Sequence, residues 1–152
     1  MLKKETPMNH IETALIKDTI ESVHRYRDHA MWEKIEDQFT QAPFVDDKAL
    51  TSDQPGVKKA VDIISGWKGE LRNYFYATRH RIRSTRVSLK SAKEATAVSP
   101  ILGQYFITDR GERYVLSIEG TYNYDLVKRA GKWKIGGLSF KLKNQSLRPI
   151  GA

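Results

Sequence analysis

The chain has 152 residues, 39% of them hydrophobic, and a formal net charge of +8 from 26 Lys and Arg against 18 Asp and Glu. This length suits one domain with a modest core, and the basic balance favours acidic partners without bearing on the fold. The absence of cysteine excludes disulfides, thiolate nucleophiles and cysteine-based metal sites. No secretory signal or apolar run of membrane-spanning length is visible, so we expect a cytoplasmic protein without a membrane segment. We expect a flexible N-terminus over 1–8, a single domain over 9–145 and a C-terminal tail over 146–152.

The first predicted element is an amphipathic helix over about residues 10–30. Asn9 and Glu12 stand three residues apart, which is the spacing of a capping box. Behind them, apolar residues recur at the three- and four-residue steps of one helix face: Ile11, Leu15, Ile16, Ile20, Val23, Tyr26 and Ala30. A shifted stripe through Trp32, Ile35 and Phe39 predicts a second short helix.

The next stretch predicts an extended link and a further helix. APFVDD (42–47) is a short apolar run bounded by proline and acids, as in a strand or extended segment. SDQPG (52–56) has the composition of a helix start, with Pro55 in the first turn. The apolar residues of the predicted helix are Val57, Ala60, Val61, Ile64, Trp67 and Leu71.

Beyond residue 78 the apolar residues alternate, which indicates strands over about 79–90, 94–108, 112–128 and 132–143. The apolar parity switches within the first of these strands, and again across Gly136 and Gly137 in the last. A strand that keeps one apolar face through such a switch needs an extra residue, and the resulting bulge bends the sheet. The sequence therefore predicts an α+β architecture, with N-terminal helices packed into a strongly curved antiparallel sheet.

Tyrosines gather on one face of the third predicted strand, where Tyr114, Tyr122 and Tyr124 share a parity. A curved sheet closed by helices forms a cone whose apolar mouth is a natural pocket for a small molecule. The tyrosines either line that pocket or fill the core, and both interpretations stay open.

A series of short motifs follows in a fixed order: Tyr26-x-Asp28-x3-Trp32, Phe39, Gly56 before a helix, YATRHRI (76–82) and GTYNYDLVKRAGKWKI (120–135). Over about residues 10–142 this order resembles the SnoaL-like branch of the nuclear transport factor 2-like superfamily. The resemblance implies a cone-shaped α+β barrel of the cystatin-like kind, commonly a homodimer through the sheet. Members of the superfamily include polyketide cyclases, scytalone dehydratase-type enzymes, ketosteroid isomerases and proteins with no known reaction.

The resemblance also implies catalytic residues. Asp28 matches the pocket aspartate of the dehydratase-like members, and His80 matches the histidine of their first long strand. A carboxylate bonded to one ring nitrogen fixes the tautomer and raises the basicity of the other nitrogen, which can then take a proton beside a carbonyl. Tyr105 or Tyr122 would hydrogen-bond the developing enolate oxygen. The side chains expected to bind substrate are Tyr26, Trp32, Tyr105, Tyr122 and Tyr124, and we expect no metal and no organic cofactor.

Two interpretations of function remain open. The first is a SnoaL-like small-molecule-binding protein that acts as a cofactor-independent lyase or isomerase (a dehydratase, isomerase or cyclase) on a hydrophobic carbonyl compound. The second is a non-catalytic ligand-binding or protein-interaction and dimerisation module of the same fold. The dehydratase pattern has a second histidine on a later strand, whereas this chain has none after His80. That departure favours the second interpretation.

The basic stretch RHRIRSTRVSL (79–89) raises a nucleic-acid alternative. The strand lacks interleaved aromatic residues and matches no nucleic-acid motif, which disfavours this alternative. Alternation instead places Arg79, Arg81 and Arg83 on the outer face, solvated or paired with acids of a neighbouring strand. His80 and Ile82 then point inward.

Overall fold

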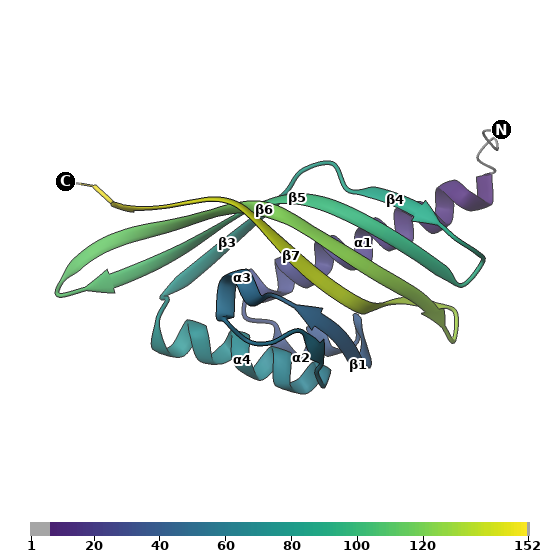
Figure 1. Cartoon of the computed structure of the whole chain (residues 1–152), viewed down its shortest axis with the longest axis horizontal. Coiled ribbons are helices and arrows are strands. Elements are labelled where there is room, and N and C mark those ends of the chain that lie inside the picture. The colour runs from purple at the N-terminus through teal and green to yellow at the C-terminus, as the bar shows by residue number, and fades with distance from the viewer. Residues whose placement is uncertain (1–6, 152) are drawn as a thin grey trace.

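The computed structural model describes residues 7–151, which form a helical N-terminal half and a long-stranded C-terminal half (Figure 1). Residues 1–6 of the expected flexible N-terminus lie outside the described residues, and helix α1 already begins at Pro7. The elements in chain order are α1 (Pro7–Asp28), α2 (Trp32–Glu36), β1 (Phe39–Asp46), α3 (Lys48–Thr51), β2 (Gly56–Val57), α4 (Ala60–Asn73), β3 (Ala77–Ile82), β4 (Arg86–Leu89), β5 (Glu94–Asp109), β6 (Glu112–Arg129) and β7 (Lys132–Pro149).

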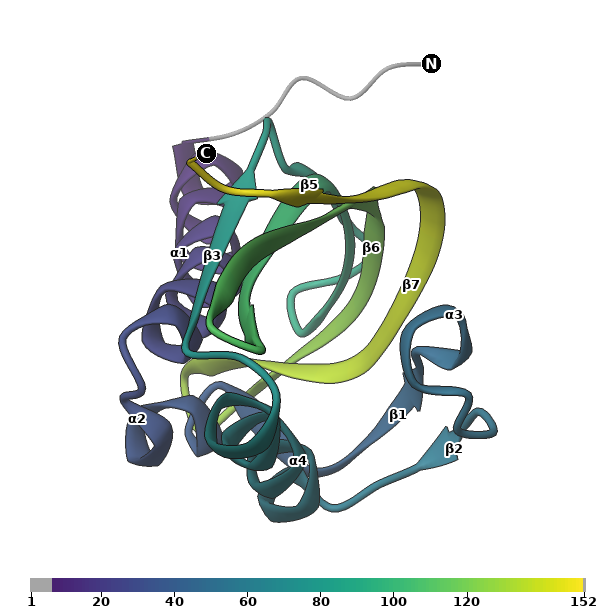
Figure 2. The same cartoon turned by 90° about the vertical axis from the view of Figure 1, so that its left-hand side faces the viewer.

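One curved sheet carries the fold, with strand order β2-β1-β7-β6-β5-β3 and with β4 paired to β5 beyond β3. Figure 2 shows the sheet arching from β3 round to β7, with α1 along one side and α4 below. The arch does not close, since β3 and β2 are its two ends. The predicted α+β class and curved sheet are confirmed. One strand pair departs from the antiparallel expectation, because β1 runs parallel to β7.

Both predicted parity switches correspond to extra residues. Between the pairs Ile82–Ile101 and Arg86–Val98, three residues on one strand face two on the other. In β7, Gly136 is the extra residue, because Asp125 pairs with Gly137 and Leu126 with Ile135. A further register shift, which alternation does not predict, leaves one extra residue in β7 opposite the step from Glu119 to Gly120. These irregularities bend the long strands around the helices.

The apolar stripe predicted for α1 is buried only in part. Ile16 and Ile20 are fully buried, whereas Ile11 and Leu15 are about half exposed. Glu12 does not cap the helix but binds Lys128 Nζ at 2.7 Å and the Trp133 indole N–H at 2.5 Å. These bonds hold the first half of α1 against β6 and β7.

Two segments differ from the sequence prediction. Helix α4 begins at Ala60 rather than near Pro55, because Gly56 and Val57 pair with β1 instead. The segment expected to be a C-terminal tail belongs to β7 up to Pro149, where it pairs with the start of β6. None of the helices within residues 7–151 is long and apolar enough to cross a membrane.

Candidate active site

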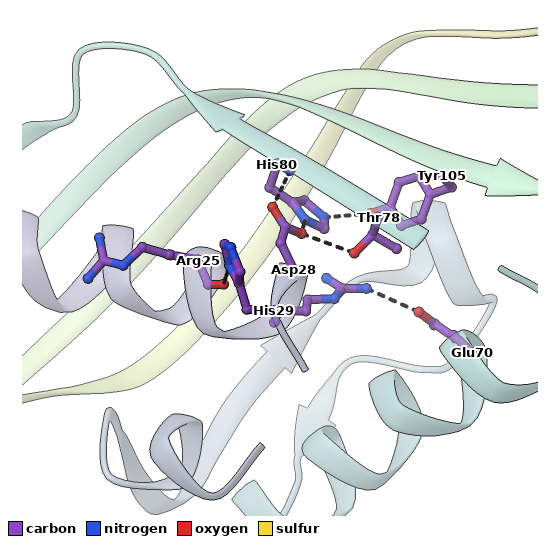
Figure 3. A network of polar contacts seen from close by, with 8 residues as sticks. Arg25, Asp28, His29, Glu70, Thr78, His80 and Tyr105 are labelled. Atoms are coloured by element: carbon purple, nitrogen blue, oxygen red, sulfur yellow. Dashed lines mark hydrogen bonds and ion pairs between the residues drawn. The ribbon is translucent and has the colours of Figure 1, made fainter. Parts of the chain in front are cut away.

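The end of α1 meets β3 through the carboxylate of Asp28. Its Oδ1 lies 2.6 Å from His80 Nδ1, and its Oδ2 accepts the backbone N–H of His80 at 2.6 Å. The Thr78 hydroxyl donates to Oδ1 at 3.0 Å. Figure 3 shows the three residues meeting at this point. The contact expected between Asp28 and His80 is therefore present.

The partners of His80 determine which ring nitrogen carries its proton. A carboxylate only accepts, so Nδ1–H faces Asp28 and Nε2 keeps its lone pair. The Tyr105 hydroxyl, 3.0 Å away, donates to Nε2. The His80 side chain is 1% exposed. Burial lowers the pKa of His80 below its ordinary value, although the hydrogen bond that His80 donates to Asp28 acts in the opposite direction. A neutral imidazole with an accepting Nε2 follows.

Local structure explains how Asp28 reaches this position. It is the last residue of α1, and the chain then reverses through Ala30, whose φ is 55°. The helix therefore ends where β3 passes, and the carboxylate reaches Thr78 and His80 of that strand. In β3 alternation turns Thr78 and His80 inward, while Arg79 and Arg81 are exposed, as predicted.

Tyr105 projects from β5 beside His80, because Thr78 and His80 of β3 pair with Tyr105 and Gly103. The two rings meet edge to face, with centroids 5.4 Å apart. A Cβ on Gly103 would lie 3.0 Å from Tyr105 Cε2 and 3.4 Å from His80 Cδ2. Glycine at this position therefore leaves the space in which the tyrosine leans over the histidine.

A cavity of about 800 Å³ opens between the concave sheet and helices α3 and α4. Tyr105 and Tyr122 lie in its wall, and so does Arg27, the residue before Asp28. The apolar part of the lining is Val45, Leu50, Val57, Ile63, Trp67, Phe75, Leu116, Ile118 and Leu138. His80 is not in this wall. It touches a void of about 10 Å³ that it shares with Tyr105 and Tyr122, so Tyr105 separates the histidine from the cavity.

His24 joins the site one helical turn before Asp28 and is 3% exposed. Its ring centroid is 5.5 Å from that of His80, and its Nε2 lies 2.9 Å from the Tyr124 hydroxyl. Burial, with a smaller contribution from His80, lowers the pKa of His24 well below its ordinary value. Sequence reasoning did not place His24 here, although its four-residue spacing from Asp28 is a usable signal.

The predicted substrate-binding residues divide into two groups. Tyr105 and Tyr122 face the cavity, and burial raises the pKa of each phenol. Tyr124 is buried against His24 and is not in the cavity wall. Tyr26 and Trp32 pack against the outside of the core and are also absent from that wall.

Thr78, Arg27 and Glu70 are site residues that the sequence did not reveal. A second open groove of about 670 Å³ reaches Asp28 and His80 from the α1 side, past Arg25 and His29.

Within residues 7–151 no group of three or more His, Cys, Asp or Glu side chains has the arrangement to hold a metal ion. One acid of strand β6, Glu119, binds Lys143 at 3.2 Å.

Solved structures share this fold at low sequence identity. The Kfla4162 protein from Kribbella flavida has a TM-score of 0.80 and 17% identity, covering 90% of this chain and 94% of its own. A candidate scytalone dehydratase from Novosphingobium aromaticivorans has a TM-score of 0.79 and 18% identity, covering 97% and 99%. A LinA-type3 hexachlorocyclohexane dehydrochlorinase from Novosphingobium barchaimii has a TM-score of 0.72 and 14% identity, covering 92% and 90%.

No curated protein matches the sequence. The family model of the SnoaL-like domain does match, and it covers residues 12–138, which is most of the chain. The matched region includes α1 with Asp28, β3 with His80 and most of the curved sheet. Together with the neighbours of the same fold, this match shows that the chain belongs to the SnoaL-like family.

Proposed function

We propose that the protein is a cofactor-independent enzyme that moves a proton on a hydrophobic carbonyl compound and so brings about a dehydration, isomerisation or cyclisation. The observation that carries this proposal is the 2.6 Å contact between Asp28 and the neutral ring of His80. An imidazole held this way has a fixed tautomer and a more basic second nitrogen, as general base catalysis requires. The cavity beside it has the volume of a small-molecule site.

Tyr105 connects the base to the cavity. In the free protein its hydroxyl donates to His80 Nε2. A substrate carbonyl in the cavity would compete for that O–H, and the Tyr105 side chain would turn aside to open Nε2 to the cavity. His80 then takes the proton from the carbon next to the carbonyl, and the C–H electron pair moves into an enolate whose oxygen accepts from Tyr105. Because burial raises the pKa of Tyr105, the phenol keeps its proton and acts as a donor.

The second half of the reaction returns the proton. The imidazolium formed on His80 is stabilised by the Asp28 carboxylate, 2.6 Å from Nδ1. It gives its Nε2 proton to another carbon in an isomerisation, or to a leaving hydroxyl in a dehydration. The names of two similar structures, a dehydratase and a dehydrochlorinase, denote eliminations, and removal of a carbon-bound proton is common to such reactions. This shared chemistry supports the proposal.

The test is hydrogen–deuterium exchange at the carbon next to the carbonyl, followed by NMR in D2O for a panel of apolar ketones and β-hydroxy ketones. At least one compound should exchange faster with protein than in buffer. His80→Gln should lower that rate by about 10²–10⁴-fold, the usual contribution of a general base. His29→Gln, which replaces an exposed histidine bonded to the Arg25 carbonyl, is the control and should keep the rate.

Two results would contradict the proposal. One is wild-type exchange in His80→Gln, which would show that another group removes the proton. The other is a panel in which no compound exchanges above the buffer rate although some bind, which would favour a ligand-binding module without catalysis.

A further inference from the structure

Arg27 is a buried cation in the wall of the cavity. The residue is 5% exposed. One partner contacts an edge of its guanidinium group, and another contacts its face. Its Nη2 donates to Glu70 Oε2 at 3.0 Å, and its Cζ lies over the Trp67 ring, 4.3 Å from the ring centre. All three residues line the same cavity. Because an isolated buried charge is strongly unfavourable, this group needs a counter-charge within the cavity.

Glu70 supplies that counter-charge only in part. Its side chain is 32% exposed, and burial raises the pKa of its carboxyl despite the neighbouring guanidinium. A guanidinium has five N–H donors in a planar fork that suits a carboxylate, whereas Glu70 accepts from one nitrogen of Arg27. The other hydrogen-bond partners of Arg27 are the neutral phenols of Tyr105 and Tyr122. The five donors outnumber these three partners, so Arg27 can also donate to a second anionic oxygen pair.

The other charged groups of the cavity lie at its rim. Lys58 is held by Asp53 at 3.1 Å and by Asp47 at 3.8 Å. Lys59 and Asp62 are exposed to solvent. Among residues 7–151, Arg27 is thus the one buried cation in the cavity wall. The lining beyond it is apolar and includes Ile63, Phe75 and Leu116.

Arg27 also lies close to the proposed reaction centre. Its Cζ is 5.9 Å from the ring centre of Tyr105, whose hydroxyl binds His80 Nε2. The guanidinium acts to lower the pKa of the Tyr105 and Tyr122 phenols, although burial of both phenols outweighs it. An anion bound at Arg27 would therefore hold the rest of its molecule against these two hydroxyls.

We propose that the cavity takes an apolar small molecule bearing one carboxylate, and that Arg27 binds this carboxylate while Glu70 yields its position. This inference names the substrate class of the proposed function and rests on that function for the place of the substrate. The internal Arg27–Glu70 pair is the model for the interaction, because a protein carboxylate already occupies one edge of the guanidinium. The apolar walls would cover the remainder of the ligand.

The experiment measures binding by calorimetry for matched acid and amide pairs, 2-naphthoate with 2-naphthamide and 4-phenylbutyrate with 4-phenylbutyramide. The wild-type protein should bind an acid at least about tenfold more tightly than its amide, because a hydrogen bond to a charged group is stronger than a neutral one. Arg27→Met should abolish this preference and Arg27→Lys should reduce it. Lys58→Met, which removes a rim cation from the same cavity, is the matched control and should leave the preference unchanged.

Glu70→Gln provides an independent arm, because it keeps Arg27 and removes the competing charge. It should increase the affinity for the acid by about tenfold and leave the affinity for the amide unchanged. If Arg27→Met fails to fold, as a circular dichroism melt would show, Arg27→Lys and Glu70→Gln decide the question.

The proposal is overturned if acid and amide bind equally, if none of the acids binds, if the preference survives in a folded Arg27→Met protein, or if it is undiminished in Arg27→Lys. It is also overturned if Glu70→Gln does not increase the affinity of the protein for the acid. These measurements need no turnover, so His80→Gln should keep the preference. Loss of the acid preference alongside intact carbon-proton exchange would reject this inference and leave the proposed function standing. The reverse pattern would reject the proposed function alone.

Discussion

Replacing Asp28 by asparagine tests the link between the carboxylate and the tautomer of His80. Asp28 accepts three hydrogen bonds, one from Thr78 and two from His80. In Asp28→Asn, one oxygen is replaced by an NH2 group that only donates. The least disruptive arrangement keeps the amide oxygen on the backbone N–H of His80 and turns the NH2 group toward Nδ1. The imidazole must then move its proton to Nε2 and donate it to the Tyr105 hydroxyl.

The magnitude follows from these bonds. A hydrogen bond to a charged acceptor contributes about 1 kcal/mol more than a neutral one, so three bonds that lose the charge weaken the folded state by about 3 kcal/mol. For a chain of this length that loss lowers the melting temperature by about 6–12 °C. Carbon-proton exchange should fall by about 10²–10⁴-fold, because a protonated Nε2 cannot accept a further proton.

The assays are a circular dichroism melt, the exchange measurement and nitrogen-15 NMR of the imidazole, which identifies the protonated nitrogen. Asp18→Asn is the control, since Asp18 is exposed on the same helix and should change none of the three. A melting temperature within about 2 °C of wild type would refute the hydrogen-bond count. A proton that remains on Nδ1 in Asp28→Asn would refute the tautomer argument.

Three further predictions concern the sheet, the buried histidines and the phenol. Gly120→Ala should lower the free energy of unfolding by about 3 kcal/mol in urea denaturation, because the new Cβ would overlap Phe140 and the Lys141 carbonyl. Gly136→Ala, where the nearest neighbour of the new Cβ is 3.6 Å away, should be close to neutral. Equal free energies of unfolding for the two variants would contradict this prediction. The free energy of unfolding should fall as pH drops through 6.5, because His24 and His80 have lowered pKa values in the folded state while the unfolded chain takes up the protons. His24→Gln should reduce that slope by up to about 1.4 kcal/mol per pH unit, and an unchanged slope would count against a buried neutral His24. Tyr105→Phe should lower carbon-proton exchange by about 10²-fold, since the enolate oxygen loses its donor, and a wild-type rate would remove Tyr105 from the mechanism.

The sequence by itself determines much of the sheet, because strand alternation is a local property. The inward direction of His80 and the outward direction of Arg79 follow from their parity in β3, and both are observed. The parity switch at Gly136 predicts the bulge found there, since an extra residue is the only way to keep one face apolar. The order of helices before strands likewise follows from the change of period near residue 78.

Only the tertiary structure decides which residues of α1 meet the sheet. The apolar stripe predicts burial of Leu15, yet Leu15 is about half exposed, and the buried face runs through Ile20 and Val23 to Arg27. An arginine is not an apolar signal in the sequence, and its burial depends on Trp67 and Glu70, which are 40 and 43 positions away. The Asp28–His80 contact joins residues 52 apart, and it exists because α1 ends where β3 passes. The local alternation of β3 thus orients His80, whereas long-range packing brings the Asp28 carboxylate to it and buries Arg27 in the cavity wall.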